Sequence, residues 1–137
     1  MKHFAELTVR SYECDSYGHV NNAVYLNYLE YARMEYLHKI GFDYNAAVAE
    51  GFYLYVTHID IYYKASAFLD DKLTIEVYSV NLGAVSGTMH QVIRKEDGTV
   101  CVEADVTWAS VNKENGRPCR LPEKFMVPGL LPDKSGT

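Results

Sequence analysis

The 137-residue chain has little that would mark it as a membrane or nucleic-acid protein. It has no apolar run long enough to cross a bilayer, and its first residues lack the apolar centre of a signal peptide. Its 13 Lys and Arg are outnumbered by 18 Asp and Glu, and the net charge of −5 comes without any basic cluster. We therefore expect no membrane partner and no nucleic-acid partner.

Cysteine is also scarce. Cys14, Cys101 and Cys119 are an odd number at no metal-ligand spacing, so they predict free thiols in a reducing compartment, the cytoplasm. The five His and three Cys show no ligand motif, so we expect no metal. Cys14 stands beside Asp15 and could be a nucleophile, but no paired base is evident in the sequence.

Internal repeats and low-complexity linkers are absent, and the length suits one domain. We therefore assign residues 1–137 to a single domain. Its last stretch, 128–137, is rich in Pro, Gly and Ser, which predicts a frayed tail.

Hydrophobic spacing divides the chain into one long helix and several strands. Apolar side chains recur every three or four positions from residue 23 to about 40, as on a helix with one buried face. Asn21 or Asn22 can cap its start, and Gly41 matches its end. A short helix is predicted over 44–50. Alternating or β-rich segments predict strands at 4–12, 52–64, 71–82, 86–95 and 100–112.

This order predicts an α+β architecture, in which a five-stranded antiparallel sheet wraps around one long central helix. The sheet is needed to cover the apolar stripe of the helix. Its edge strands would stay exposed unless they pair with another copy of the chain. We therefore expect a homo-oligomer.

A polar, glycine-containing loop just before the helix carries the candidate chemistry. Asp15 could activate a water or attack a carbonyl, or it could simply cap backbone amides of the loop. The free N–H groups at a helix start carry partial positive charge, so the backbone N–H of Asn22 could hold a thioester carbonyl oxygen. An ordinary capped helix would have the same sequence.

Other side chains nearby could contact a substrate. His19 suits a base, an orienting donor or a ligand contact, although a structural role is the alternative. Tyr17 and Tyr25 could line an acyl channel, with core packing as the alternative for Tyr25. Glu30 and Arg33, three apart on the helix, could form an ion pair, or Glu30 could reach the site as a second carboxylate.

The stretch from Asp15 to Arg33, DSYGHVNNAVYLNYLEYAR, resembles the hotdog-fold acyl-CoA thioesterases of the hydroxybenzoyl-CoA thioesterase type. In those proteins an Asp, a Gly three residues later and a Tyr-x-x-Tyr-x-Glu-x-Ala-Arg helix recur. The segments 59–73 and 112–122 also resemble the family. The resemblance implies a hotdog fold and thioester hydrolysis without cofactor or metal.

The resemblance also implies roles for particular residues. Asp15 matches the catalytic Asp, Gly18 the glycine of the tight loop, and Asn22 the helix-start residue whose N–H polarises the carbonyl. The family forms homodimers or homotetramers with sites at subunit interfaces. The run from His19 to Asn22 further resembles plant acyl-ACP thioesterases, in which an equivalent His is implicated in catalysis.

The predicted substrate is an acyl-CoA, with an acyl carrier protein (ACP) thioester as the alternative. Some CoA-using members carry basic residues just before the position of Ser86, where this chain has Ala84 and Val85. Contacts to the CoA phosphates would then fall to Arg94, Arg117 and Arg120. Ser86 is itself a predicted substrate contact. An acyl-CoA dehydratase or hydratase, and a non-catalytic acyl-CoA binder, are the remaining alternatives.

Overall fold

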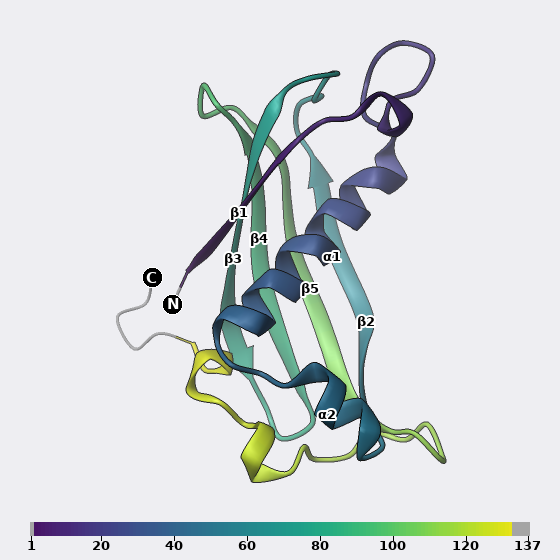
Figure 1. The fold of residues 1–137 in the computed structure, drawn as a ribbon, viewed down its shortest axis with the longest axis vertical. Coiled ribbons are helices and arrows are strands. Elements are labelled where there is room, and N and C mark those ends of the chain that lie inside the picture. Colours follow the sequence, from purple (N-terminus) through teal and green to yellow (C-terminus); the bar gives the residue numbers. More distant parts are fainter. Residues whose placement is uncertain (1, 133–137) are drawn as a thin grey trace.

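The computed structural model describes residues 2–132, which form one sheet and one long helix (Figure 1). The strands are β1 (His3–Thr8), β2 (Phe52–Tyr63), β3 (Lys72–Leu82), β4 (Ser86–Lys95) and β5 (Val100–Asn112). The helices are α1 (Asn22–Lys39) and α2 (Tyr44–Ala49). Single 3₁₀ turns cover Ser11–Glu13, Glu123–Phe125 and Pro128–Leu130.

The sheet has the strand order β1-β3-β4-β5-β2, and every neighbouring pair is antiparallel. α1 lies across one face of this sheet (Figure 1). The predicted five-stranded sheet around one central helix is thus confirmed. The first strand was predicted too long, because it ends at Thr8 and the 3₁₀ turn at Ser11–Glu13 follows.

α1 begins where the sequence predicts, because the Asn21 side chain accepts a hydrogen bond from the Ala23 N–H at 2.9 Å. Its buried face packs on the concave side of the sheet and includes Leu29 and Ala32, both 0 % exposed. The upper half of this face shares a core with β1, β3 and the start of β5. The lower half packs against Trp108 and the C-terminal segment.

The C-terminal segment is ordered further than the sequence predicts. The predicted frayed tail begins at residue 128, but Leu130 is 1 % exposed and its carbonyl accepts a hydrogen bond from the Ser79 hydroxyl at 2.7 Å. The Tyr36 hydroxyl donates to the carbonyl of Gly129. A frayed tail would be exposed to solvent, whereas residues 129 and 130 are held against the core by these contacts. Residues 133–137 lie outside the described part of the chain.

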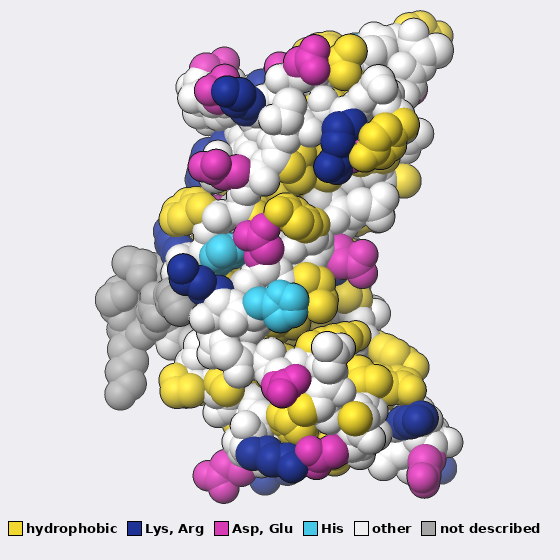
Figure 2. Space-filling view, in the orientation of Figure 1, with side chains coloured by type: hydrophobic (Ala, Val, Ile, Leu, Met, Phe, Trp, Pro, Cys, Tyr) yellow, Lys and Arg dark blue, Asp and Glu magenta, His cyan; other side chains and the backbone are white. Residues whose placement is uncertain are grey.

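Lys and Arg side chains are scattered over the helix-bearing face rather than gathered in one place (Figure 2). Within residues 2–132, no helix combines the length and the apolar character needed to cross a membrane.

Candidate active site

The Asp15 loop is a tight turn that holds one carboxylate oxygen and leaves the other available. Oδ1 of Asp15 accepts from the backbone N–H groups of Tyr17 at 2.9 Å and His19 at 3.2 Å. The Asp15 N–H in turn donates to the His19 carbonyl, and Gly18 adopts a φ of 82° that L side chains rarely reach. Asp15 therefore caps backbone amides of the loop through Oδ1, as predicted, while its Oδ2 accepts no hydrogen bond from the described residues.

The loop leads directly into the start of α1. Asn21 is the N-cap, and Asn22 is the first helical residue. Within the described residues, the Asn22 N–H donates to no protein acceptor, whereas the next two N–H groups are bound by Asn21. A free N–H at the positive end of an 18-residue helix is a ready donor to an oxyanion.

His19 lies at the junction between this loop and the chain before β3. Its backbone bridges to Phe68, and its ring packs edge-on against the Phe68 ring at 4.8 Å. No hydrogen bond to the His19 ring is found in residues 2–132, so its nitrogens remain available to a ligand. Tyr17 is 85 % exposed and could move against a bound substrate.

A buried carboxylate under the loop was not evident from the sequence. Glu13 is 7 % exposed and accepts from the Arg10 backbone N–H and the Tyr28 hydroxyl, both at 2.8 Å, and from the Arg10 guanidinium. Burial alone would raise the pKa of Glu13, but these hydrogen bonds outweigh it and the pKa is lowered. This cluster ties the loop that carries Asp15 to the body of α1. In the sequence, only the three-residue spacing of Arg10 and Glu13 could have indicated this cluster, because Tyr28 is 15 residues further along the chain.

Cys14 lies in the same turn but is poorly suited to be a nucleophile. Burial raises the pKa of its thiol, and the charges of Glu13 and Asp15 raise it further. A protonated thiol is a weak nucleophile, so the raised pKa argues against Cys14 as the reacting group.

Some predicted binding residues lie elsewhere. Tyr25 is 3 % exposed, and its hydroxyl accepts from the Ala67 N–H at 2.9 Å, so the structure places it in the core. Ser86 starts β4 and Arg117 lies in the turn after β5, both at the end of the sheet opposite the start of α1 (Figure 1). Within one chain, neither is brought to the Asp15 loop.

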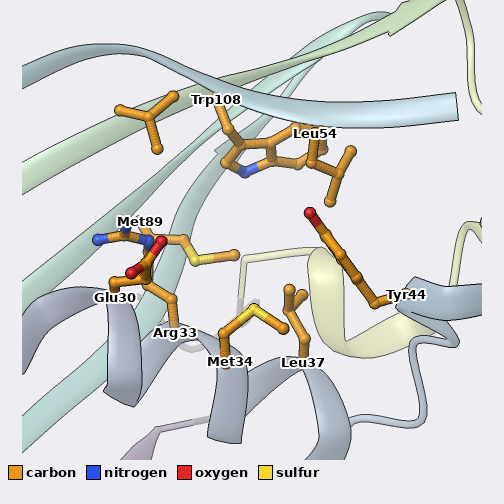
Figure 3. A pocket seen from close by; sticks show the side chains of 9 residues that line it. Glu30, Arg33, Met34, Leu37, Tyr44, Leu54, Met89 and Trp108 are labelled. Atoms are coloured by element: carbon orange, nitrogen blue, oxygen red, sulfur yellow. The ribbon is translucent and has the colours of Figure 1, made fainter. Parts of the chain in front are cut away.

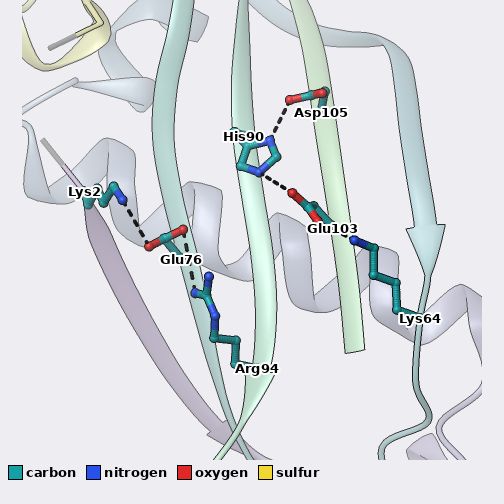
Figure 4. A network of polar contacts seen from close by, with 7 residues as sticks. All are labelled: Lys2, Lys64, Glu76, His90, Arg94, Glu103 and Asp105. Atoms are coloured by element: carbon teal, nitrogen blue, oxygen red, sulfur yellow. Dashed lines mark hydrogen bonds and ion pairs between the residues drawn. The ribbon is translucent and has the colours of Figure 1, made fainter. Parts of the chain in front are cut away.

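Arg94 lies on the outer face of the sheet, away from α1 (Figure 4). It pairs there with Glu76 at 3.7 Å, beside a second network in which His90 contacts Glu103 and Asp105. Among residues 2–132, no group of three or more His, Cys, Asp or Glu is arranged to hold a metal ion.

A pocket opens further along α1, between α1, α2 and the sheet (Figure 3). Arg33 reaches it but does not form the predicted ion pair with Glu30. Its guanidinium donates instead to Oε1 of Gln91 at 3.1 Å, and the Gln91 amide donates to the Leu29 carbonyl at 3.0 Å. Gln91 is 58 residues away in sequence, so local spacing could not indicate this partner.

Comparison with known proteins assigns the chain to a family. The sequence profile of the thioesterase-like superfamily matches residues 9–128, which include the loop, all of α1 and four of the strands. The chain belongs to this superfamily.

Named relatives of this thioesterase-like chain include acyl-CoA hydrolases. It is 36 % identical over 117 residues to the long-chain acyl-CoA thioesterase FadM of Escherichia coli (strain K12), a match that covers 85 % of this chain and 88 % of FadM. It is 31 % identical over 115 residues to the acyl-CoA thioester hydrolase YbgC of Escherichia coli O157:H7, covering 84 % and 86 % of the two chains.

Solved structures of hotdog thioesterases share the fold. A DHNA-CoA thioesterase from Staphylococcus aureus superimposes with a TM-score of 0.85 at 23 % identity, over 91 % of this chain and 84 % of that one. The predicted family and the predicted hotdog fold are both confirmed. The roles of individual site residues stay predictions.

Proposed function

We propose that this chain hydrolyses acyl-CoA thioesters at the junction of the Asp15 loop and α1. The observation that carries the proposal is the free N–H of Asn22 at the start of a long helix, preceded by a turn that leaves Oδ2 of Asp15 available. Membership of the superfamily and the two acyl-CoA-hydrolysing relatives support this reaction class.

The chemistry needs two groups. The Asn22 N–H would hold the thioester carbonyl oxygen as it gains negative charge, and one such donor contributes about 3 kcal/mol to transition-state stabilisation. Asp15 would either take a proton from the attacking water or attack the carbonyl carbon itself. In both routes the C–S bond breaks, CoA leaves as the thiol after protonation, and water supplies the oxygen of the free acid. His19 and Tyr17 would orient the substrate.

A second copy of the chain would complete the site. β2 is a 12-residue edge strand, and Tyr55, Tyr62 and Tyr63 on it are 51 %, 61 % and 46 % exposed. Such a long apolar edge is normally paired or covered. The Tyr63 hydroxyl also donates to the Asn22 carbonyl at 3.3 Å, so pairing along β2 would bring the partner close to the start of α1. We propose a homodimer or homotetramer.

Pairing would also give the distant basic residues a role. Arg117, which lies far from the loop of its own subunit, could reach the CoA tail bound to the partner. The net charge of −5 does not favour an equally acidic carrier protein as the acyl donor. We place the reaction in the cytoplasm, in keeping with the unpaired cysteines Cys14, Cys101 and Cys119.

The test is thiol release from a panel of acyl-CoAs, from acetyl to palmitoyl with benzoyl and phenylacetyl, by the purified protein. We expect Asp15→Asn to lower kcat by at least about a hundredfold while the oligomer and circular dichroism are kept. Asp97→Asn is the matched control, because Asp97 also caps a loop amide, that of Thr99, but lies in the β4–β5 turn. Full activity in Asp15→Asn would refute the mechanism, and no release from any acyl-CoA would refute the function.

A further inference from the structure

The pocket beside the second half of α1 is apolar except for a few polar groups that point into it (Figure 3). Its apolar lining comes from α1, β2, β4 and β5, and consists of Met34, Leu37, Leu54, Val56, Met89 and Trp108. A pocket of this kind, with an apolar wall and a small number of convergent polar groups, is typical of a small-molecule site.

Four polar groups at this pocket have donors or acceptors that no protein atom uses. Arg33 donates one hydrogen bond, to Gln91, and its other N–H groups have no protein acceptor among the described residues. Among the described residues, the Glu30 carboxylate, the Tyr44 hydroxyl and the Trp108 indole N–H make no hydrogen bond. Figure 3 shows the Tyr44 hydroxyl and the Trp108 ring nitrogen facing the same space, with Glu30 and Arg33 together at one end.

The unpartnered polar atoms of these groups are open to solvent in the pocket, because among the described residues no buried side-chain nitrogen or oxygen lacks a hydrogen-bond partner. Burial lowers the pKa of the Arg33 guanidinium, and the charge of Glu30 offsets this only in part. Polar groups against apolar surface cost free energy unless a partner forms hydrogen bonds with them. A ligand that supplies such a partner would therefore bind better than one that is wholly apolar.

The donors and acceptors in the pocket indicate which oxygen-containing group of a ligand would fit there. At the end where Glu30 and Arg33 lie together, Arg33 can donate, whereas the Glu30 carboxylate can only accept. A hydroxyl both donates and accepts, so it can satisfy both kinds of group. A second carboxylate would face the charge of Glu30, and a ketone has no proton to give it.

The position of the pocket indicates where that hydroxyl lies. Arg33 follows Asn22 by eleven residues of α1, which corresponds to roughly 16 Å along the helix axis. Its side chain leans back toward the start of the helix. Because an extended alkyl chain advances slightly less per carbon than a helix does per residue, an acyl chain held at Asn22 would reach Arg33 after about a dozen carbons.

We infer that this pocket binds the middle of a long acyl chain and prefers chains that carry a hydroxyl group there, held by Glu30 and Arg33. The inference rests on the proposed function, because it takes the acyl chain to start at Asn22. It names long-chain hydroxyacyl thioesters as the preferred substrate class.

The experiment compares kcat/KM for stearoyl-CoA, for its derivative hydroxylated on the twelfth carbon, and for β-hydroxystearoyl-CoA. We expect the mid-chain hydroxyl to raise kcat/KM about tenfold, the effect of one good hydrogen bond to a charged group, and the β-hydroxyl to give no such gain. Glu30→Met and Arg33→Met should each bring the ratio of kcat/KM for the mid-chain hydroxylated substrate to that for stearoyl-CoA close to one. Tyr78→Phe, whose ring packs against His90 on the outer face of the sheet, should keep the ratio.

The outcomes separate the two proposals. Turnover of stearoyl-CoA with no preference for the mid-chain hydroxyl, or an equal gain from the β-hydroxyl, would overturn this inference and leave the thioesterase function intact. A preference that survives in Glu30→Met would also overturn it, and that variant leaves the buried hydrogen bonds of Gln91 with Arg33 and Leu29 in place. No turnover of any acyl-CoA would overturn both.

Discussion

Glu13 should stabilise the protein through its charge, and Glu13→Gln tests this. The carboxylate accepts from two donors at 2.8 Å and from the Arg10 guanidinium at its other oxygen. Gln keeps the shape but loses the charge, and it turns an NH₂ group toward donors. Hydrogen bonds to charged groups are worth about 1.5–3 kcal/mol, so we expect a loss of about 2 kcal/mol.

The loss can be expressed as a melting temperature. An unfolding entropy of about 2.1 cal/mol/K per residue gives about 0.29 kcal/mol/K for 137 residues, so about 2 kcal/mol lowers Tm by about 7 °C. Thermal unfolding by circular dichroism, at one protein concentration, measures it. Glu96→Gln is the control, because Glu96 is exposed and has no ion-pair partner among the described residues.

The pH dependence separates charge from shape. The folded state lowers the pKa of Glu13, so its stabilisation is complete above the unfolded value of about 4.3 and is lost as the pH falls through the folded pKa. The difference between wild type and Glu13→Gln should therefore shrink as the pH falls from about 5 toward 3. Equal melting temperatures at neutral pH, or a difference that is unchanged in acid, would refute the reasoning.

Three further changes test other parts of the structure. Asn21→Ala removes the cap of α1 and should cost about 1 kcal/mol in urea unfolding, whereas Asn21→Asp should keep most of it. Cys14→Ser should keep turnover, because the raised thiol pKa argues against a nucleophile; loss of activity would reopen that role. Gly87→Ala would place a Cβ 2.7 Å from the Trp108 ring, so we expect a loss of about 1–3 kcal/mol and a shifted Trp fluorescence, and wild-type values for both would contradict the packing.

Much of the fold was predictable because its signals are local. The strands β4 and β5 have the predicted bounds, and α1 begins within one residue of its predicted start, because alternation, helical spacing and the Asn cap each act over a few neighbours. The two wrong predictions, the end of the first strand and the frayed tail, concern segments that are fixed by tertiary contacts. The chain after Thr8 leaves the strand where Glu13 turns inward to Arg10 and Tyr28, and the segment at Leu130 is ordered because Ser79 and the core bind it.

The candidate site divides in the same way. Asp15, Gly18, His19 and Asn22 are close in sequence, so the loop and the helix start are recognisable as one unit from the order of their residues. Their exact roles depend on which lone pairs and N–H groups the folded loop leaves free, and local sequence does not specify this.

By itself the sequence determined the architecture, the family and the position of the acid beside a helix start, because these depend on spacing between near neighbours. Only the tertiary structure decided which groups meet across the fold. It joined Arg33 to Gln91 rather than to Glu30, and it placed Tyr44 and Trp108 around one pocket. Such contacts follow from how α1 lies on the sheet, and this packing brings together residues that are far apart in the chain.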